Sequence, residues 1–250
     1  RNLSNHSLIS LEVLTPFIVT VVSALLFIFV EMKLKDPMMD IRIFRKFSFS
    51  LYNIVSFFFG FSMFLSVTFL PSYIQLSFGY SVSQSVYAIN PFAISMIFSA
   101  IIGGIMMTKI GGRKTMLFGS ILLSVFSIIF TLIHTTPVSF YITSILLGFG
   151  LGISMTPMNH IVMEEGGREN QGRSAGIVSI MRSMGGIIGP TLAGFLISRI
   201  DFSSFFVMDE LLRTYRRIFS MVSASAILMV ILSVLGLLST KKPMEGRVCE

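Results

Sequence analysis

Polar side chains that stand alone within long apolar segments are the residues of this sequence best suited to chemistry. Arg182 is the one charge well inside such a segment, and it follows Arg173 by nine positions, about 13 Å along a helix. A guanidinium in apolar surroundings is costly, so it usually faces water or the interior of a helix bundle. We expect Arg182 to contact a bound solute, a carboxylate of a partner segment or backbone carbonyls. The alternative is that its long side chain reaches back to the membrane surface.

A second set of candidates combines amides with aromatic and thioether side chains at helical spacing. A face of this kind suits a bulky apolar ligand, because methionine repacks readily around different shapes. Contact with lipid or with a neighbouring helix is an equally good interpretation of any single member. The members are Asn53, Phe57 and Phe64 on one segment, and Met155 and Asn159 on another.

The apolar segments that carry these residues are long enough to cross a membrane. No Asp, Glu, Lys or Arg occurs from Phe47 to Thr108, and 53% of the 250 residues are hydrophobic whereas 12% are charged. A bilayer core of roughly 30 Å requires about 20 apolar residues in a helix. The segments lack the alternation of a membrane β-strand. We therefore predict an all-α polytopic membrane protein with seven transmembrane helices, at 12–30, 48–71, 83–108, 115–134, 138–162, 174–198 and 218–239.

The charges between the segments predict an orientation. Lysine and arginine gather in 31–46, 109–114, 163–173 and the tail, whereas 72–82 and 135–137 contain none. Cytoplasmic loops collect these residues, so we expect an outside N-terminus and a cytoplasmic C-terminus in the cell membrane. The same rule explains the net charge of +7 without nucleic acid as a partner. Arg213, Arg216 and Arg217 fall on the opposite side and indicate an amphipathic approach to the last helix.

The sequence holds no residue set typical of an enzyme, a metal centre or a cofactor site. Its one cysteine, Cys249, lies in a polar tail, and neither a Ser/His/Asp set nor a glycine-rich phosphate loop occurs. No Asp or Glu lies deep in a predicted helix, although proton coupling usually needs an intramembrane carboxylate. We predict a protein that is not an enzyme and binds neither metal nor cofactor.

Glycines inside the predicted helices indicate close helix packing. Gly185, Gly186 and Gly189 precede Pro190, and small residues four apart let helix backbones approach in lipid. The proline predicts a kink. The segments 104–110 (GIMMTKI) and 194–200 (GFLISRI) also resemble each other. This is weak support for an inverted repeat of three helices, an arrangement found in transporters.

The sharpest motif is the segment 104–114, which reads GIMMTKIGGRK. It resembles the cytoplasmic loop motif of the major facilitator superfamily, Gly-x-x-x-Asp-Arg-x-Gly-Arg-Arg/Lys. Thr108 stands at the family's Asp and Gly112 at an Arg, so the resemblance does not extend to the family's loop ion pair. The resemblance implies a loop that gates the inward- and outward-facing states, and a generic basic turn is the alternative. The matching residues are Gly104, Lys109, Gly111, Arg113 and Lys114.

A longer resemblance covers nearly the whole chain. The segments LGFGLGISMTP (147–157) and RSMGGIIGP (182–190), with the linker motif DPMMDIRIF (36–44), are similar to the C-terminal half of the 14-helix drug:proton antiporter branch. The resemblance implies an extra transmembrane helix at 1–30, a cytoplasmic linker at 31–47, a six-helix C-terminal bundle at 48–240 and a cytoplasmic tail at 241–250. The segment 185–194 (GGIIGPTLAG) also resembles the glycine–proline motif of antiporters, which the family places in its N-terminal half; close helix packing with a proline kink is the alternative.

The resulting hypothesis is a secondary transporter half that acts by alternating access. The resemblance implies membrane lipid, a small amphipathic substrate, protons as coupling ion and an N-terminal transporter half as partners. In the family the second and fifth predicted helices line the central cavity. A carrier for a non-drug solute is the first alternative. A seven-helix scaffold or binding protein without transport of its own is the second.

Overall fold

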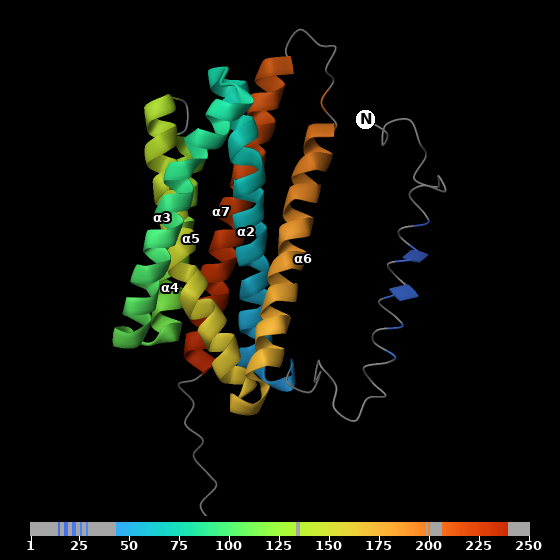
Figure 1. Cartoon of the computed structure of the whole chain (residues 1–250), viewed down its shortest axis with the longest axis vertical. Helices are drawn as coiled ribbons and strands as arrows, with labels where there is room; N and C mark the ends of the chain where they lie inside the picture. The colour runs from blue at the N-terminus through green and yellow to red at the C-terminus, as the bar shows by residue number, and fades with distance from the viewer. Residues whose placement is uncertain are drawn as a thin grey trace, which may run out of the picture. The chain divides into compact units, whose positions relative to one another are not determined.

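The computed structural model describes residues 44–133, 136–198, 200 and 207–239, and isolated positions between 15 and 29. The chain divides into two units, 1–42 and 43–250. The described positions of the first unit are helical. The described part of the second is all-α (Figure 1), with helices α2 (Phe47–Phe78), α3 (Val82–Ile110), α4 (Gly112–Leu132), α5 (Pro137–Gly166), α6 (Gln171–Ser198) and α7 (Val207–Ser239), and a 3₁₀ turn η2 (Arg168–Asn170).

Six helices in the described ranges are long and apolar enough to cross a membrane. The structure therefore supports six of the seven predicted helices within its described ranges. The first predicted helix, 12–30, lies mostly outside the described residues, as do most of the linker and the tail after Ser239. The last six predicted helices each have a counterpart from α2 to α7.

Two predicted boundaries were wrong by about two turns or more. α2 runs through Pro71 to Phe78, where Gly79 takes a left-handed conformation with φ 67°. A proline removes one backbone donor, but the sequence is uncharged on both sides of Pro71 and the helix continues through it. α7 begins at Val207 rather than at 218, because its arginine-containing approach is helical and continuous with the apolar part.

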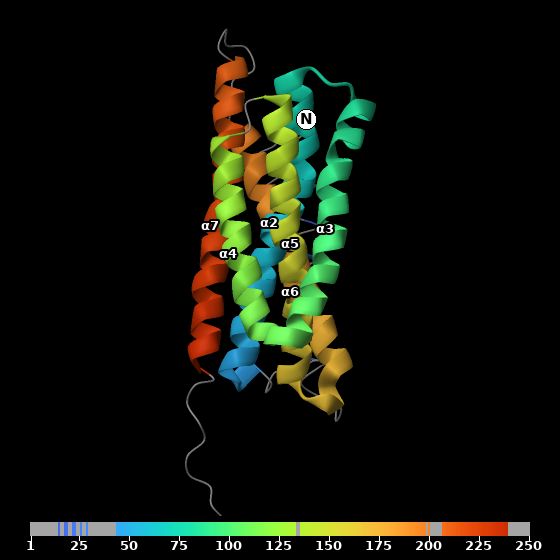
Figure 2. The ribbon, with the colours of Figure 1, turned by 90° about the vertical axis from the view of Figure 1, so that its left-hand side faces the viewer.

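The helices form two layers. α5 and α2 pack against each other, α3 packs on α5, and α6 packs on α2. The other side of α5 and α2 contacts α4 and α7, which pack together. Figure 2 shows α4 and α7 on one side of the bundle. The row α3–α5–α2–α6 thus has one face covered by helices.

The two sets of three helices pack in the same way. Exchanging α2 with α5, α3 with α6 and α4 with α7 converts each principal helix contact into another that is present. The contact of α3 with α5 becomes that of α6 with α2, and the contact of α4 with α5 becomes that of α7 with α2. This is the pairing that the weak internal sequence repeat requires.

Two close approaches in these pairs occur at corresponding positions. Gly60 of α2 lies against the backbone of Arg182 in α6, so a Cβ added there would meet its carbonyl group. Gly148 of α5 lies in the same way against the carbonyl of Phe92 in α3. Phe92 is 1% exposed. The position that Arg182 occupies in α6 is thus occupied in α3 by a buried phenylalanine.

A second pair of contacts fixes this correspondence. Three residues beyond Arg182, Gly185 lies against the backbone carbonyl of Phe57. Three residues beyond the corresponding Phe92, Ser95 donates its hydroxyl to the carbonyl of Ile145 at 2.7 Å. The spacing along each helix is the same in both pairs, so the two interfaces share one register.

An aromatic cluster fills the bundle end where α2 and α4 end and where α5 and α7 begin. The ring of Tyr73 stacks on Phe140 at 5.9 Å and 20°, and Phe130 contacts Phe219 at 4.7 Å edge to face. Rings in such geometries attract one another beyond the burial of their area. The cluster joins four helices at the end that the charge pattern places outside.

Candidate functional site

Arg182 and Asn159 lie in one cavity between α5 and α6. The cavity, here the Arg182 cavity, has a volume of about 180 Å³. Arg182 Nη1 donates to Asn159 Oδ1 at 3.5 Å, and both side chains are half-buried. Two residues that sequence analysis selected on separate helices are therefore brought together. The lining residues are Asn159, Met163, Ala175, Val178, Ser179 and Arg182.

The depth of Arg182 follows from its place in α6. It lies eleven residues after Gln171, which is about 16 Å along the helix axis. A neighbouring cavity of about 560 Å³, nearer the end of the bundle, is lined by His160, Met163, Glu164, Gly167 and Gln171. The two cavities share Met163, so this side chain stands between the bundle end and the arginine.

Glycines hold the backbone around Arg182 in place. Gly60 meets the backbone of Arg182, and Gly185 meets the carbonyl of Phe57 one turn further along. Without side chains at these two positions, α2 and α6 approach until backbone atoms are in contact. Gly186 and Gly189 continue the seam against the rings of Phe64 and Phe61. The glycines predicted for packing thus position the arginine, and Pro190 lies within the same helix.

The other predicted cavity residues lie outside the Arg182 cavity. Asn53 is 1% exposed inside the bundle, where its Nδ2 donates to the Phe49 carbonyl at 2.8 Å. Phe57 is half-buried and touches Phe58 edge to face at 5.4 Å. Phe64 is 39% exposed, and Met155 is half-buried on α5. These four side chains therefore do not share the cavity of Arg182.

A second polar group joins three helices at the end where α2 begins. Arg113, near the start of α4, forms a hydrogen-bonded ion pair with Glu165 at the end of α5. Both side chains are partly buried, at 29% and 17% exposed. Lys46, just before α2, donates to the backbone carbonyl of Glu165 at 3.2 Å. Glu165 thus supplies a carboxylate to a loop whose motif has threonine in place of aspartate.

The remaining residues of the predicted gating loop build the turn that presents Arg113. Gly111 joins α3 to α4 at φ 87° and ψ 151°. Gly104 packs near the Thr156 methyl group, while Lys109 and Lys114 are exposed. Thr108 donates its hydroxyl to the Ile105 carbonyl of its own helix at 2.8 Å, so it takes no part in the ion pair.

The Arg113–Glu165 pair is expected to stabilise the bundle. In a double-mutant cycle with Arg113→Ala and Glu165→Gln, we expect a coupling energy of about 1–3 kcal/mol, because both charges are partly withdrawn from water. The measurement is the free energy of unfolding of the purified protein in detergent. Strictly additive losses would show that the pair contributes nothing.

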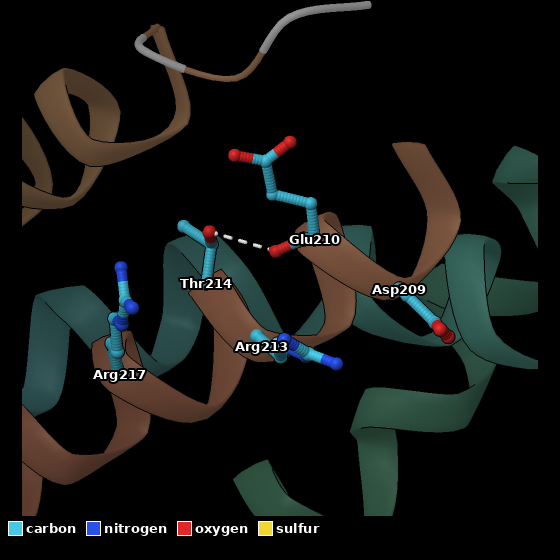
Figure 3. A pocket seen from close by; sticks show the side chains of 5 residues that line it. All are labelled: Asp209, Glu210, Arg213, Thr214 and Arg217. Atoms are coloured by element: carbon cyan, nitrogen blue, oxygen red, sulfur yellow. Dashed lines mark hydrogen bonds between the residues drawn. The ribbon is translucent and has the colours of Figure 1, made fainter. Parts of the chain in front are cut away.

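A polar cavity of about 360 Å³ lies at the start of α7, at the other end of the bundle from the Arg113–Glu165 pair (Figure 3). Thr214 donates to the Glu210 carbonyl at 2.9 Å, and Arg213 and Arg217 are exposed. No ion pair joins these arginines to Asp209 or Glu210 among the described residues. Tyr215 and Ile218 of the same turns are buried, so this part of the helix has one charged exposed side and one buried side.

Sequence analysis did not identify Glu165 as the partner of Arg113. The signal that could have identified it is that 109–114 and 163–173 were predicted on the same side of the membrane. The packing role of Gly60 was also not identified, because its partner on α6 is visible only once the helices are packed. Among the described residues, no cluster of His, Cys, Asp or Glu is suited to a metal ion.

Comparisons with known proteins agree on one family. The family model of the Major Facilitator Superfamily matches residues 13–190 and, in a second alignment, 52–247. The multidrug transporter protein MdtP of Bacillus subtilis is 29% identical over 74% of this chain and 35% of its own length. The multidrug resistance protein Stp of Mycobacterium tuberculosis is 28% identical over 71% of this chain and 33% of its own. The chain spans about a third of the length of these relatives.

A solved structure has the same fold. The crystal structure of the E. coli fucose:proton symporter FucP matches with a TM-score of 0.58 and 20% identity, over 80% of this chain and 50% of that one. The six apolar helices, their two-layer packing and the matched residues lead to one assignment: this chain is a multi-pass membrane protein and belongs to the Major Facilitator Superfamily.

Proposed function

We propose that this chain forms the C-terminal half of a secondary transporter that exports drugs or other amphipathic molecules by alternating access. One observation carries the proposal. Arg182 lies in a cavity about 16 Å into α6, whereas the corresponding position in α3 is the buried Phe92. The shared packing therefore does not require an arginine, and a costly charge at this depth points to a ligand or a partner.

The layers explain why a second bundle is needed. Only 22% and 17% of the most apolar segments of α3 and α6 are buried, the lowest values of the six helices. The row α3–α5–α2–α6 has helices on one face, and two helices of that row, α5 and α6, line the Arg182 cavity. Alternating access needs two bundles that move against each other around the site, and this chain supplies one of them. We therefore assign the uncovered face to an N-terminal bundle and the remaining surface to membrane lipid.

Matched packing of the two helix triplets supports the inverted repeat. Because α2 and α5 are separated by two helices, they run in opposite directions, as inverted repeats require. The Arg113–Glu165 pair and the Gly111 turn then lie at the cytoplasmic end and would act as the gating loop. An outside N-terminus, a first helix within 1–30 and a cytoplasmic tail complete the proposed topology.

Drug export and proton coupling are supported by the names of the similar proteins. The relatives above are named as multidrug proteins, and the solved neighbour is named as a proton symporter. The described helices contain acidic residues only near their ends: Glu164 and Glu165 in α5, and Asp209 and Glu210 in α7. We therefore place the coupling carboxylate in the N-terminal bundle.

The test is efflux of several dyes from cells that express the full-length transporter, with the proton gradient present and then collapsed. We expect gradient-dependent efflux. Efflux of every dye at the rate of cells lacking the transporter would overturn drug export. Transport that survives collapse of the gradient would overturn proton coupling.

The corresponding variant is Arg182→Ala. We expect it to lower drug resistance severalfold while membrane abundance stays normal, because the side chain borders a cavity and the contact with Gly60 is made by its backbone. Resistance and the amount of protein in membranes are measured together. Unchanged resistance would remove Arg182 from the transport site.

A further inference from the structure

The Arg182 cavity carries one charged side chain and no opposite charge. The other lining residues are an amide, a hydroxyl and three apolar side chains. In the described part of the chain, Arg182 forms no ion pair. Its one hydrogen bond to a side chain, to Asn159, has a length of 3.5 Å. A guanidinium has five N–H donors, so most of them remain available to a ligand.

The nearest carboxylates along α5 are engaged elsewhere. Glu165 pairs with Arg113. Glu164 is exposed, and its Oε2 lies 3.8 Å from His160 Nδ1 in the neighbouring cavity. Neither residue lines the Arg182 cavity, so the charge of that cavity is positive.

We propose that the Arg182 cavity binds the carboxylate of amphipathic anions and zwitterions, so that the transporter prefers them to lipophilic cations of the same shape. This inference rests on the proposed function and specifies its substrate class. The fork of N–H groups in arginine matches the two oxygens of a carboxylate. A cation would instead meet a like charge in a partly dehydrated cavity, where repulsion is stronger than in water.

The rest of the cavity suits the start of an apolar body. Asn159, which also lines the cavity, accepts from Arg182 through Oδ1, and its NH₂ group is a second donor for a ligand. Met163 and Val178 provide apolar walls, and methionine adapts to varied shapes. At about 180 Å³ the cavity is smaller than a drug-sized pocket of roughly 300 Å³ or more. It holds the charged end of the ligand, and the remainder extends past Met163 or toward the partner bundle.

The experiment compares two dyes that differ only at the carboxylate. Rhodamine B carries a free carboxylate, and its ethyl ester has the same ring system with that group blocked. Uptake of each dye is measured in inside-out vesicles containing the full-length transporter. The variants are Arg182→Gln and Arg182→Lys, with Arg173→Gln as the matched control. Arg173 is on the same helix and outside the cavity, and it donates to Asn170 at 3.2 Å.

We expect the wild type to transport rhodamine B with the lower KM. Arg182→Gln should raise that KM by about tenfold or more, the loss of one charge-assisted contact, and should leave the KM of the ester unchanged or lower. Arg182→Lys should give an intermediate value, and Arg173→Gln the wild-type pattern.

Two results would overturn the inference while leaving the proposed function intact. One is a wild type that transports the ester as well as or better than rhodamine B. The other is an equal loss for both dyes in Arg182→Gln, which would show that Arg182 pairs with a protein carboxylate. Absence of transport for both dyes and for the wider dye panel would overturn the proposed function itself.

Discussion

Substituting Gly185 with alanine is expected to separate α2 from α6 and to abolish most transport. An added Cβ would overlap the backbone carbonyl of Phe57. Backbone cannot turn away as a flexible side chain can, so one helix must shift. Overpacking of this kind costs about 1–3 kcal/mol or more, against a gain of only about 0.5–1 kcal/mol in helix propensity. The measurement is the unfolding temperature in detergent, with membrane abundance and dye efflux alongside.

The matched control lies on the same helix. A Cβ at Gly194 would meet nothing within 4 Å. Gly194→Ala therefore gains propensity without a clash and should keep or slightly raise stability. Equal behaviour of the two variants would show that the seam between α2 and α6 tolerates a methyl group.

A partial loss in Gly185→Ala is informative about the site. Gly185 lies one turn from Arg182, whose own backbone rests on Gly60. A shift of α6 would move the guanidinium away from Asn159. We expect the protein that still reaches the membrane to show a raised KM for rhodamine B, as Arg182→Gln does.

The sequence predicted the membrane helices well because lipid imposes a simple rule. A charge-free stretch such as Phe47 to Thr108 has few structures available to it, since the backbone must satisfy its own hydrogen bonds. The start of α7 was less predictable, because that rule does not apply to it. α7 starts at Val207 because polar, arginine-containing sequence also forms helix outside the apolar core.

The site was predictable only in part, because contacts between helices leave no local pattern. Arg182 and Asn159 stood out as polar residues in apolar segments, and they share a cavity. Asn53 stood out for the same reason, yet it donates to the carbonyl of Phe49 in its own helix. Nothing in the neighbouring sequence distinguishes the two amides. The partner of Arg113 was likewise hidden, because Glu165 lies on another helix.

The turn between α3 and α4 is expected to fail when Gly111 receives any side chain. Its φ of 87° with ψ of 151° is a conformation that only glycine adopts readily. A Cβ there would meet nothing within 4 Å, so the penalty comes from the backbone alone. We expect Gly111→Ala and Gly111→Val to cost about 1–3 kcal/mol each. This can be relieved only by rebuilding the turn.

Rebuilding that turn would displace Arg113, two residues further on, from Glu165. We therefore expect Gly111→Val to impair dye transport, and its loss of stability to shrink when Glu165→Gln is already present. Gly172 is the control, since a Cβ there also meets open space while its φ lies outside the glycine region. Wild-type transport by Gly111→Val would show that the turn tolerates strain and that the loop does not gate. Equal losses in Gly111→Val and Gly172→Val would trace the effect to a β-branched side chain at either helix start rather than to φ.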